Sequence, residues 1–183
     1  MTEPLWTPSQ ARIAASHMQR FLERVRDRLN SSVTDYDGLY HWSLDHPETF
    51  WRELWDFAGV IGDGPGDIGT EHWPEMPGTR WFPEARLNFA ENLLRRRDEG
   101  TAIVFAGEDG ARRELSYQAL YAEVARTAQA LKDAGVQPGD RVAGYLPNLP
   151  ETVIAMLAAA SLGAVWSSCS PDFGVQGVLD RFG

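Results

Sequence analysis

The sequence predicts an α/β fold, in which a helical N-terminal extension precedes the first strand–helix units of a parallel sheet that the chain does not complete. Six of the seven tryptophans lie before residue 90, in a stretch with helical periodicity and no long β-branched run. After residues 88–100 the chain becomes rich in Ala, Val and Leu, and short apolar runs alternate with helix-length segments. Such alternation with short connections predicts right-handed crossovers and a parallel sheet of two or three strands.

The N-terminal half begins with a predicted helix over Ser9–Leu29, where apolar residues recur on one face and charged residues occupy the other. A second helix is predicted to start at Asp45–Glu48, because Pro47 suits the first turn of a helix, and to end at Gly59. Its aromatic stripe indicates burial in the core rather than a cofactor site. The stripe consists of Phe50, Trp51, Leu54, Trp55 and Phe57.

Residues 59–80 are predicted to form a loop. They contain Gly64-Pro65-Gly66-Asp67-Ile68-Gly69, which matches the G-x-G-x-x-G pattern of dinucleotide-binding loops. That pattern must follow a strand and open a helix whose N–H groups face the pyrophosphate. Here a helix precedes it, and Pro74 and Pro77 prevent a helix after it, so the match predicts a surface loop without a nucleotide.

The second half predicts strands and helices in alternation. Ser116 and Gly135 mark the start and end of its longest helix, since serine is a good N-cap and glycine a good C-terminal stop. Pro150 and Glu151 begin the next helix. The predicted strands cover residues 101–106, 113–115, 141–146 and 164–168, and the predicted helices cover residues 116–134, 150–163 and the segment after Asp172-Phe173-Gly174.

The charge pattern excludes several classes of partner. The chain has a formal net charge of −9, and Lys132 is its one lysine. It therefore lacks the basic field that nucleic acid or an anionic membrane surface requires, and we expect neither as a partner. The single cysteine, Cys169, suits a reducing compartment, and Met1-Thr2-Glu3-Pro4 lacks the features of a secretory signal. A cytoplasmic location is expected.

The sequence assigns no catalytic residue and no metal site. Cys169 has no base near it, because all four histidines lie in the first half, and it is predicted to be a buried thiol. His41 and His46 have no second ligand pair at metal spacing. The chain has no G-x-x-x-x-G-K-[ST] phosphate-binding loop.

Several motifs nevertheless resemble a known family. The runs Leu115-Ser116-Tyr117, Gly135–Val142, Leu146-Pro147-Asn148 and Pro150-Glu151 resemble the opening of the adenylate-forming acyl-CoA synthetases. Tyr40–Leu44 and His46–Trp51 are similar to the N-terminal extension of ligases of the acetyl-CoA synthetase type. Trp81–Leu94 and Trp166–Gly174 are most similar to the acetoacetyl-CoA synthetases within that family.

The resemblance implies that residues 1–95 form the N-terminal extension and residues 96–183 the start of the AMP-binding α/β domain. It implies that the whole enzyme activates acetoacetate with ATP and Mg²⁺ as an acyl-adenylate and transfers the acyl group to CoA. The family's phosphate loop, ribose-binding aspartate and adenylation lysine have no match here, so we expect the chain alone to be inactive and to bind no cofactor firmly. Two alternatives stay open: a synthetase for another short acid, of the acetyl or propionyl type, and a non-catalytic α/β binding domain.

The resemblance also implies one candidate binding site, formed by Pro171, Asp172, Phe173 and Gly174 near the CoA path. Acetyl-CoA synthetases have a Gly-Gly pair at this place, whereas this sequence has Pro171-Asp172, which argues against that acid. The structural alternative is a plain strand-to-helix turn. Acid specificity stays open, because the family's acid pocket lies beyond the matching segment. The oligomeric state stays open as well.

Overall fold

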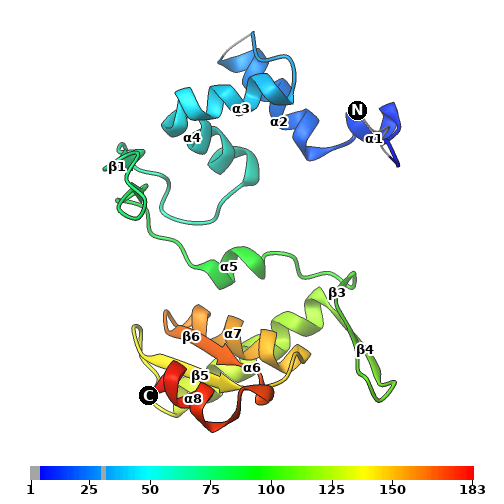
Figure 1. Ribbon diagram of the computed structural model, residues 1–183, viewed down its shortest axis with the longest axis vertical. Coiled ribbons are helices and arrows are strands. Elements are labelled where there is room, and N and C mark those ends of the chain that lie inside the picture. The colour runs from blue at the N-terminus through cyan, green and yellow to red at the C-terminus, as the bar shows by residue number, and fades with distance from the viewer. Residues whose placement is uncertain (1–4, 30–31) are drawn as a thin grey trace. The chain divides into compact units, whose positions relative to one another are not determined.

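A computed structural model describes residues 5–29 and 32–183, which form two compact units with the boundary between Arg86 and Leu87 (Figure 1). Met1–Pro4, on which the expected lack of a secretory signal rests, lie outside the described residues. The described residues contain no helix that is both long enough and apolar enough to cross a membrane.

The first unit is built on four helices: α1 (Gln10–Ala14), α2 (His17–Arg28), α3 (Tyr36–Asp45) and α4 (Pro47–Ala58). Its core forms where α2, α3 and α4 face one another, because each contributes apolar side chains to the same cluster. The buried members are Phe21, Leu22, Val25, Val33, Leu39 and Trp42, with Phe50, Leu54 and Phe57 packed against them.

In this unit one predicted helix is divided in two, and one helix was not predicted. The single helix expected over Ser9–Leu29 is broken between α1 and α2, because the Ser16 side chain accepts a hydrogen bond from the Gln19 N–H at 3.1 Å and starts a new helix. Helix α3 was not predicted. The Asp35 carboxylate caps it by accepting from the Gly38 N–H at 2.8 Å.

Helix α4 begins and ends as predicted. Pro47 occupies its first turn, and Gly59 ends it with the left-handed backbone angle φ of 61°. The prediction that its aromatic stripe is core holds for Phe50, which packs against the buried cluster. It is wrong for Trp51, which is 41% exposed and whose ring meets Trp81 edge to face at 5.5 Å.

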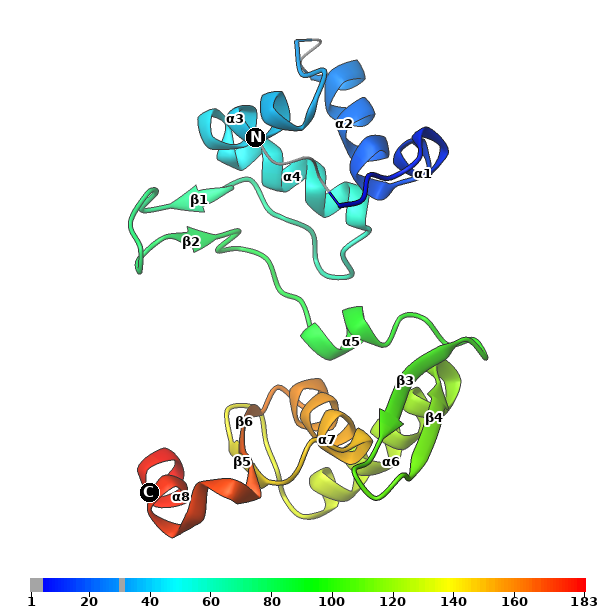
Figure 2. The same ribbon diagram turned by 45° about the vertical axis from the view of Figure 1, so that its right-hand side comes forward.

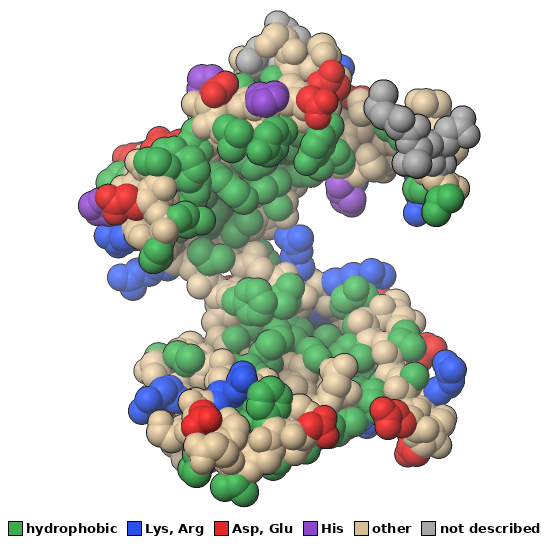
Figure 3. Space-filling view, in the orientation of Figure 1, with side chains coloured by type: hydrophobic (Ala, Val, Ile, Leu, Met, Phe, Trp, Pro, Cys, Tyr) green, Lys and Arg blue, Asp and Glu red, His purple; other side chains and the backbone are tan. Residues whose placement is uncertain are grey.

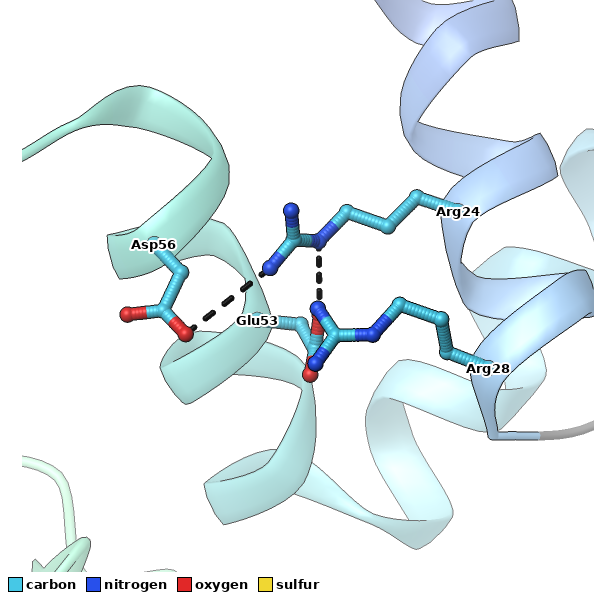
Figure 4. A network of polar contacts seen from close by, with 4 residues as sticks. All are labelled: Arg24, Arg28, Glu53 and Asp56. Carbon is cyan, nitrogen blue, oxygen red and sulfur yellow. Dashed lines mark hydrogen bonds and ion pairs between the residues drawn. The ribbon is translucent and has the colours of Figure 1, made fainter.

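A buried carboxylate joins α2 to α4 (Figure 4). Glu53 is 8% exposed, and its Oε2 accepts hydrogen bonds from Arg24 Nε at 2.7 Å and from Arg28 Nη1 at 3.1 Å. Arg24 also lies 3.8 Å from Asp56. Because the two arginines neutralise and hydrogen-bond the carboxylate, its burial is tolerated.

The loop predicted over residues 59–80 is confirmed apart from a short antiparallel hairpin of β1 (Thr70–Glu71) and β2 (Arg80–Trp81), visible in Figure 2. The Phe82 N–H donates to the Gly69 carbonyl at 2.9 Å and extends the pairing by one bond. The Asp63 N–H donates to the Arg86 carbonyl at 3.0 Å. These bonds fold the loop back onto itself.

The second unit contains α5 (Phe89–Leu93), β3 (Thr101–Ala106), β4 (Arg112–Ser116), α6 (Tyr117–Asp133), β5 (Arg141–Tyr145), α7 (Pro150–Ser161), β6 (Val165–Cys169), a short 3₁₀ helix η1 (Pro171–Phe173) and α8 (Gly174–Phe182). The strands and the helices α6, α7 and α8 match the predicted ones closely, whereas α5 and η1 were not predicted. The predicted α/β class is confirmed, since β5 and β6 pair in parallel and form a small sheet between helices. The core of the unit is formed by Ala90, Leu94, Leu120, Val124, Ile154, Leu157 and Ala158.

The parallel sheet has two of the two or three expected strands. The strand β3 pairs with β4 as an antiparallel hairpin instead of joining β5 and β6. The turn between β3 and β4 explains this pairing, because Gly110 takes a positive φ of 84° and the chain returns directly along β3. The helices α6 and α7 pack on each other, and α7 also contacts β6.

Candidate functional site

The candidate site lies where β5 and β6 end. The last residues of the two strands, Tyr145 and Cys169, are partners in the parallel register. The Leu146 N–H donates to the Cys169 carbonyl at 3.2 Å and extends the ladder by one bond. Ligands of open α/β sheets bind at this carboxyl edge.

The turn that leaves this edge is held by its own side chains. Ser170 Oγ accepts a hydrogen bond from the Asp172 N–H at 3.3 Å and donates one to Asp172 Oδ2 at 2.8 Å. The Phe173 N–H donates to the Ser170 carbonyl at 3.1 Å and closes η1. The Asp172 carboxylate therefore folds back toward Ser170.

Gly174 connects the turn to α8. It has φ 63° and ψ 178°, a conformation that a residue with a Cβ rarely adopts, although a Cβ there would meet no atom within 4 Å. No side chain caps the N-terminus of α8, so backbone N–H groups at this end keep their hydrogen-bonding capacity. The positive end of the helix macrodipole at the same place favours an anionic group.

An open hollow of about 570 Å³ lies beside the turn, lined by Phe173, Gly177, Asp180 and Arg181. The Arg181 guanidinium sits over the Phe173 ring at 4.9 Å from its centroid. The predicted site residues Pro171–Gly174 thus form one continuous turn with a cation at its side. Tyr145, whose hydroxyl donates to the Pro171 carbonyl at 2.6 Å, was missed, because only the strand register brings it to the turn.

The Cys169 thiol is buried, as predicted, with 5% of the residue exposed. The histidines of the sequence all lie before residue 87, so the second unit has no imidazole to activate this thiol. Among the described residues, no group of three or more His, Cys, Asp or Glu side chains is placed to hold a metal ion.

The glycine-rich loop of the first unit binds a carboxylate of its own chain. The N–H groups of Asp67 and Ile68 donate to Glu84 Oε2 at 2.8 and 3.1 Å. These bonds, first that from Ile68 and then that from Asp67, lower the pKa of the Glu84 carboxyl. The loop therefore holds an internal anion where a nucleotide-binding loop would hold phosphate, in agreement with the predicted surface loop.

The first unit carries an apolar pocket of about 550 Å³ next to this loop. Its walls include Trp51, Trp73 and Trp81. The Trp81 ring lies between the other two, with its centroid 5.5 Å from that of Trp51 and 5.4 Å from that of Trp73. Figure 3 shows the broad hydrophobic area of this unit. The remaining lining residues are Ser43, Leu44, Pro47, Phe50, Met76 and Phe82. The pocket has no charged side chain, so it offers no group for acid–base chemistry.

An ion pair holds the β3–β4 hairpin to the start of α7. The Arg113 guanidinium donates to the two carboxylate oxygens of Glu151 at 2.6 and 2.7 Å. This bidentate contact is the main reason why the pKa of the Glu151 carboxyl is lowered to about 2.

We expect this pair to make folding stability pH-dependent. The folded pKa of Glu151 lies below its ordinary value of 4.5, so the stabilisation is present above pH 4.5 and is lost as the pH falls toward about 2. The increment is small, because both side chains are about half exposed. Denaturant unfolding of the chain and of Glu151→Gln between pH 2 and 6 gives the free energy of unfolding of each at every pH. The increment appears as a difference between the two proteins in how steeply that free energy changes with pH. Equal slopes for the two proteins would contradict the assignment.

Comparison with known proteins gives the class of the protein. The family described as AMP-binding enzyme matches residues 89–181, just over half of the chain, and the family described as acetyl-coenzyme A synthetase N-terminus matches residues 36–93. The chain therefore belongs to the AMP-binding enzyme family. The resemblance seen in the sequence motifs is confirmed.

Within that family, the chain is homologous to the N-terminal part of acetoacetyl-CoA synthetase. It is 48% identical over 180 residues to the acetoacetyl-coenzyme A synthetase of Rhizobium meliloti (strain 1021), covering 98% of this chain and 28% of that protein. The solved structure of acetoacetyl-CoA synthetase from Streptomyces lividans matches with a TM-score of 0.88 and 40% identity, covering 99% of this chain and 28% of that chain. The malonamoyl-CoA synthetase of Penicillium aethiopicum is 39% identical over 186 residues, covering 98% of this chain and 25% of that protein. The chain thus spans 25 to 28% of the length of these relatives.

Proposed function

We propose that the chain is the N-terminal part of an AMP-forming acid–CoA ligase that acts on acetoacetate. The acid carboxylate attacks the α-phosphorus of ATP, pyrophosphate leaves, and the CoA thiol then displaces AMP from the acyl-adenylate. The observation that carries the proposal is the 48% identity to an acetoacetyl-CoA synthetase along 98% of the chain. The similarity runs through both compact units and is therefore not confined to a shared structural module.

The proposal assigns two parts of the chain to different regions of the enzyme. Residues 1–95 form the N-terminal extension, and residues 96–183 begin the AMP-binding domain. ATP, Mg²⁺ and acetoacetate are bound by other parts of the whole enzyme, since the glycine-rich loop here already holds Glu84. Mg²⁺ offsets the phosphate charge during adenylation. The single cysteine supports a cytoplasmic location, since it suits a reducing compartment.

The test is to read the coding sequence beyond Gly183 and to assay its whole product. We expect acetoacetate-dependent exchange of pyrophosphate into ATP, followed by thioester formation when CoA is added. A whole product that exchanges pyrophosphate with no short acid would contradict the ligase assignment. It would favour the non-catalytic binding domain.

A second acid is favoured by one of the relatives, the malonamoyl-CoA synthetase, which is 39% identical to this chain. Acetoacetate and malonamate both carry a carbonyl group in the β position, one CH₂ away from the carboxylate. They differ at that carbonyl, which bears a methyl group in acetoacetate and an amino group in malonamate. A site built to hydrogen-bond the amide would reject the methyl ketone strongly, whereas an apolar site would not reject the amide as strongly. The ratio of kcat/KM for the two acids, with acetate and propionate as references, decides between them.

We also propose that Pro171–Gly174 lie along the path of CoA. The turn leaves the carboxyl edge of the parallel sheet, leads to a helix N-terminus without a side-chain cap, and has Arg181 beside it. These features suit an anionic, phosphate-bearing ligand. Asp172 opposes them with a carboxylate in the middle of the turn.

Replacing Asp172 by glycine tests this placement. In the whole enzyme, we expect Asp172→Gly to lower the KM for CoA about fivefold, because the carboxylate repels the CoA phosphates, and to leave acetoacetate-dependent pyrophosphate exchange intact. Asp172→Asn removes the same charge but keeps a side chain that reaches Ser170, so it should lower the KM for CoA to a similar extent. If exchange, thioester formation and thermal stability fall together in Asp172→Gly, Asp172 is a structural residue and the CoA placement is wrong.

A further inference from the structure

Tyr145 connects the candidate CoA turn to the neighbouring strand. It is the last residue of β5, and it pairs in register with Cys169, the last residue of β6. Its hydroxyl donates to the Pro171 carbonyl at 2.6 Å, two residues beyond the end of β6. The side chain is 50% exposed, so its ring is not a core residue whose loss would unfold the unit.

The other bonds of the turn are local. The Ser170 hydroxyl contacts Asp172, and the Phe173 N–H donates to the Ser170 carbonyl. They fix the shape of the turn but not its position relative to β5. The bond from Tyr145 to Pro171 fixes that position, because it ties the first residue of η1 to the adjacent strand.

The position of the turn determines where the start of α8 lies. Gly174 follows directly with a φ of 63°, and α8, which starts there, packs against η1. A shift of Pro171 would therefore pass to the uncapped N–H groups at the start of α8, which are the groups suited to an anion.

We infer that Tyr145 is a positioning residue for the CoA half-reaction, holding the turn Pro171–Gly174 in place through its hydroxyl. The inference rests on the proposed function, since it assumes that this turn lies on the CoA path. It goes further by assigning the position of the turn to a residue on another strand, which acts through its bond to the Pro171 carbonyl.

The experiment compares Tyr145→Phe with the wild-type whole enzyme. The change removes one hydroxyl and keeps the ring. We expect the KM for CoA and the dissociation constant of CoA measured by calorimetry both to rise about fivefold, the factor that one net hydrogen bond corresponds to. The thermal midpoint and the KM for acetoacetate in pyrophosphate exchange should stay near their wild-type values. Tyr121→Phe, which removes a hydroxyl from a tyrosine of α6 whose ring packs against Arg97, is the matched control and should change none of these quantities.

The outcomes separate the two proposals. If wild type forms acetoacetyl-CoA and Tyr145→Phe binds CoA as tightly as wild type does, the inference is overturned and the proposed function stands. If wild type binds CoA but shows no exchange with acetoacetate, the acid assignment fails, and the calorimetry still decides the role of Tyr145. If wild type does not bind CoA, both are overturned. A parallel fall of the thermal midpoint and of both half-reactions would make Tyr145 a merely structural residue.

Discussion

Glu53→Ala is expected to destabilise the helical unit by about 3 kcal/mol, at the lower end of the cost of removing one partner of a buried ion pair. Glu53 is 8% exposed and accepts hydrogen bonds from both Arg24 and Arg28. Its removal leaves two guanidinium groups facing each other without a carboxylate between them. The cost stays at the lower end because the Arg24 and Arg28 side chains are 27% and 53% exposed and can turn to water.

Two variants give this prediction its controls. Asp56→Ala removes a neighbouring carboxylate that is 59% exposed and lies 3.8 Å from Arg24, and it should change stability by less than about 0.5 kcal/mol. Glu53→Gln keeps the shape and loses the charge, so its cost should fall between the two. Denaturant unfolding followed by tryptophan fluorescence measures all three, since six tryptophans lie in this part of the chain. Equal effects of Glu53→Ala and Asp56→Ala would mean that the buried network does not hold α2 against α4.

The second unit was easier to predict than the first, for a physical reason. Its boundaries carry strong local signals: the Ser116 side chain caps α6, Gly135 follows it with a φ of 92°, and Pro150 opens α7. Local preference and tertiary packing agree at each of them, so the sequence pattern was sufficient.

The first unit contains local signals that compete. The apolar periodicity of residues 9–29 favours one helix, but Ser16 caps a new start within it and divides it. In α3, Gly38 lies in the first turn and lowers the helix propensity, and the capping bond from Asp35 compensates for it. The position of Trp51 depended on the hairpin that brings Trp81 beside it, which periodicity along one helix does not reveal.

Pairings between distant segments account for what the sequence left open. The hairpin of β3 and β4 is not one of these pairings, because the turn at Glu108-Asp109-Gly110 is visible in the sequence and returns the chain along β3. The bond from Tyr145 to Pro171 depends on the in-register pairing of β5 with β6 across α7. For the candidate CoA turn, the sequence motif predicts the residues. The tertiary structure adds Tyr145 of β5, whose hydroxyl hydrogen-bonds to the turn.

The purified 183-residue chain is expected to be catalytically silent, with no acetoacetate-dependent pyrophosphate exchange above the background without protein. Adenylation needs the ATP phosphates held in line with the attacking carboxylate. Without groups that fix this geometry and stabilise the phosphate charge, the reaction is very slow. The turn Pro171–Gly174 is assigned to CoA, and neither the glycine-rich loop nor the one lysine is placed to hold the ATP phosphates. The loop N–H groups of Asp67 and Ile68 are bound to Glu84, and Lys132, the one lysine, lies in the last turn of α6.

The same chain should nevertheless remain folded, since each unit has its own buried cluster. Circular dichroism on the sample used for the exchange assay separates a silent folded chain from an unfolded one, and the whole enzyme assayed in parallel shows that the assay detects the reaction. Exchange by the 183-residue chain that disappears in Lys132→Ala would contradict the prediction and move the phosphate-binding function into this part of the protein. Exchange that survives Lys132→Ala would contradict it as well, and would make the arginines the next candidates, because they are the other cations that this chain holds.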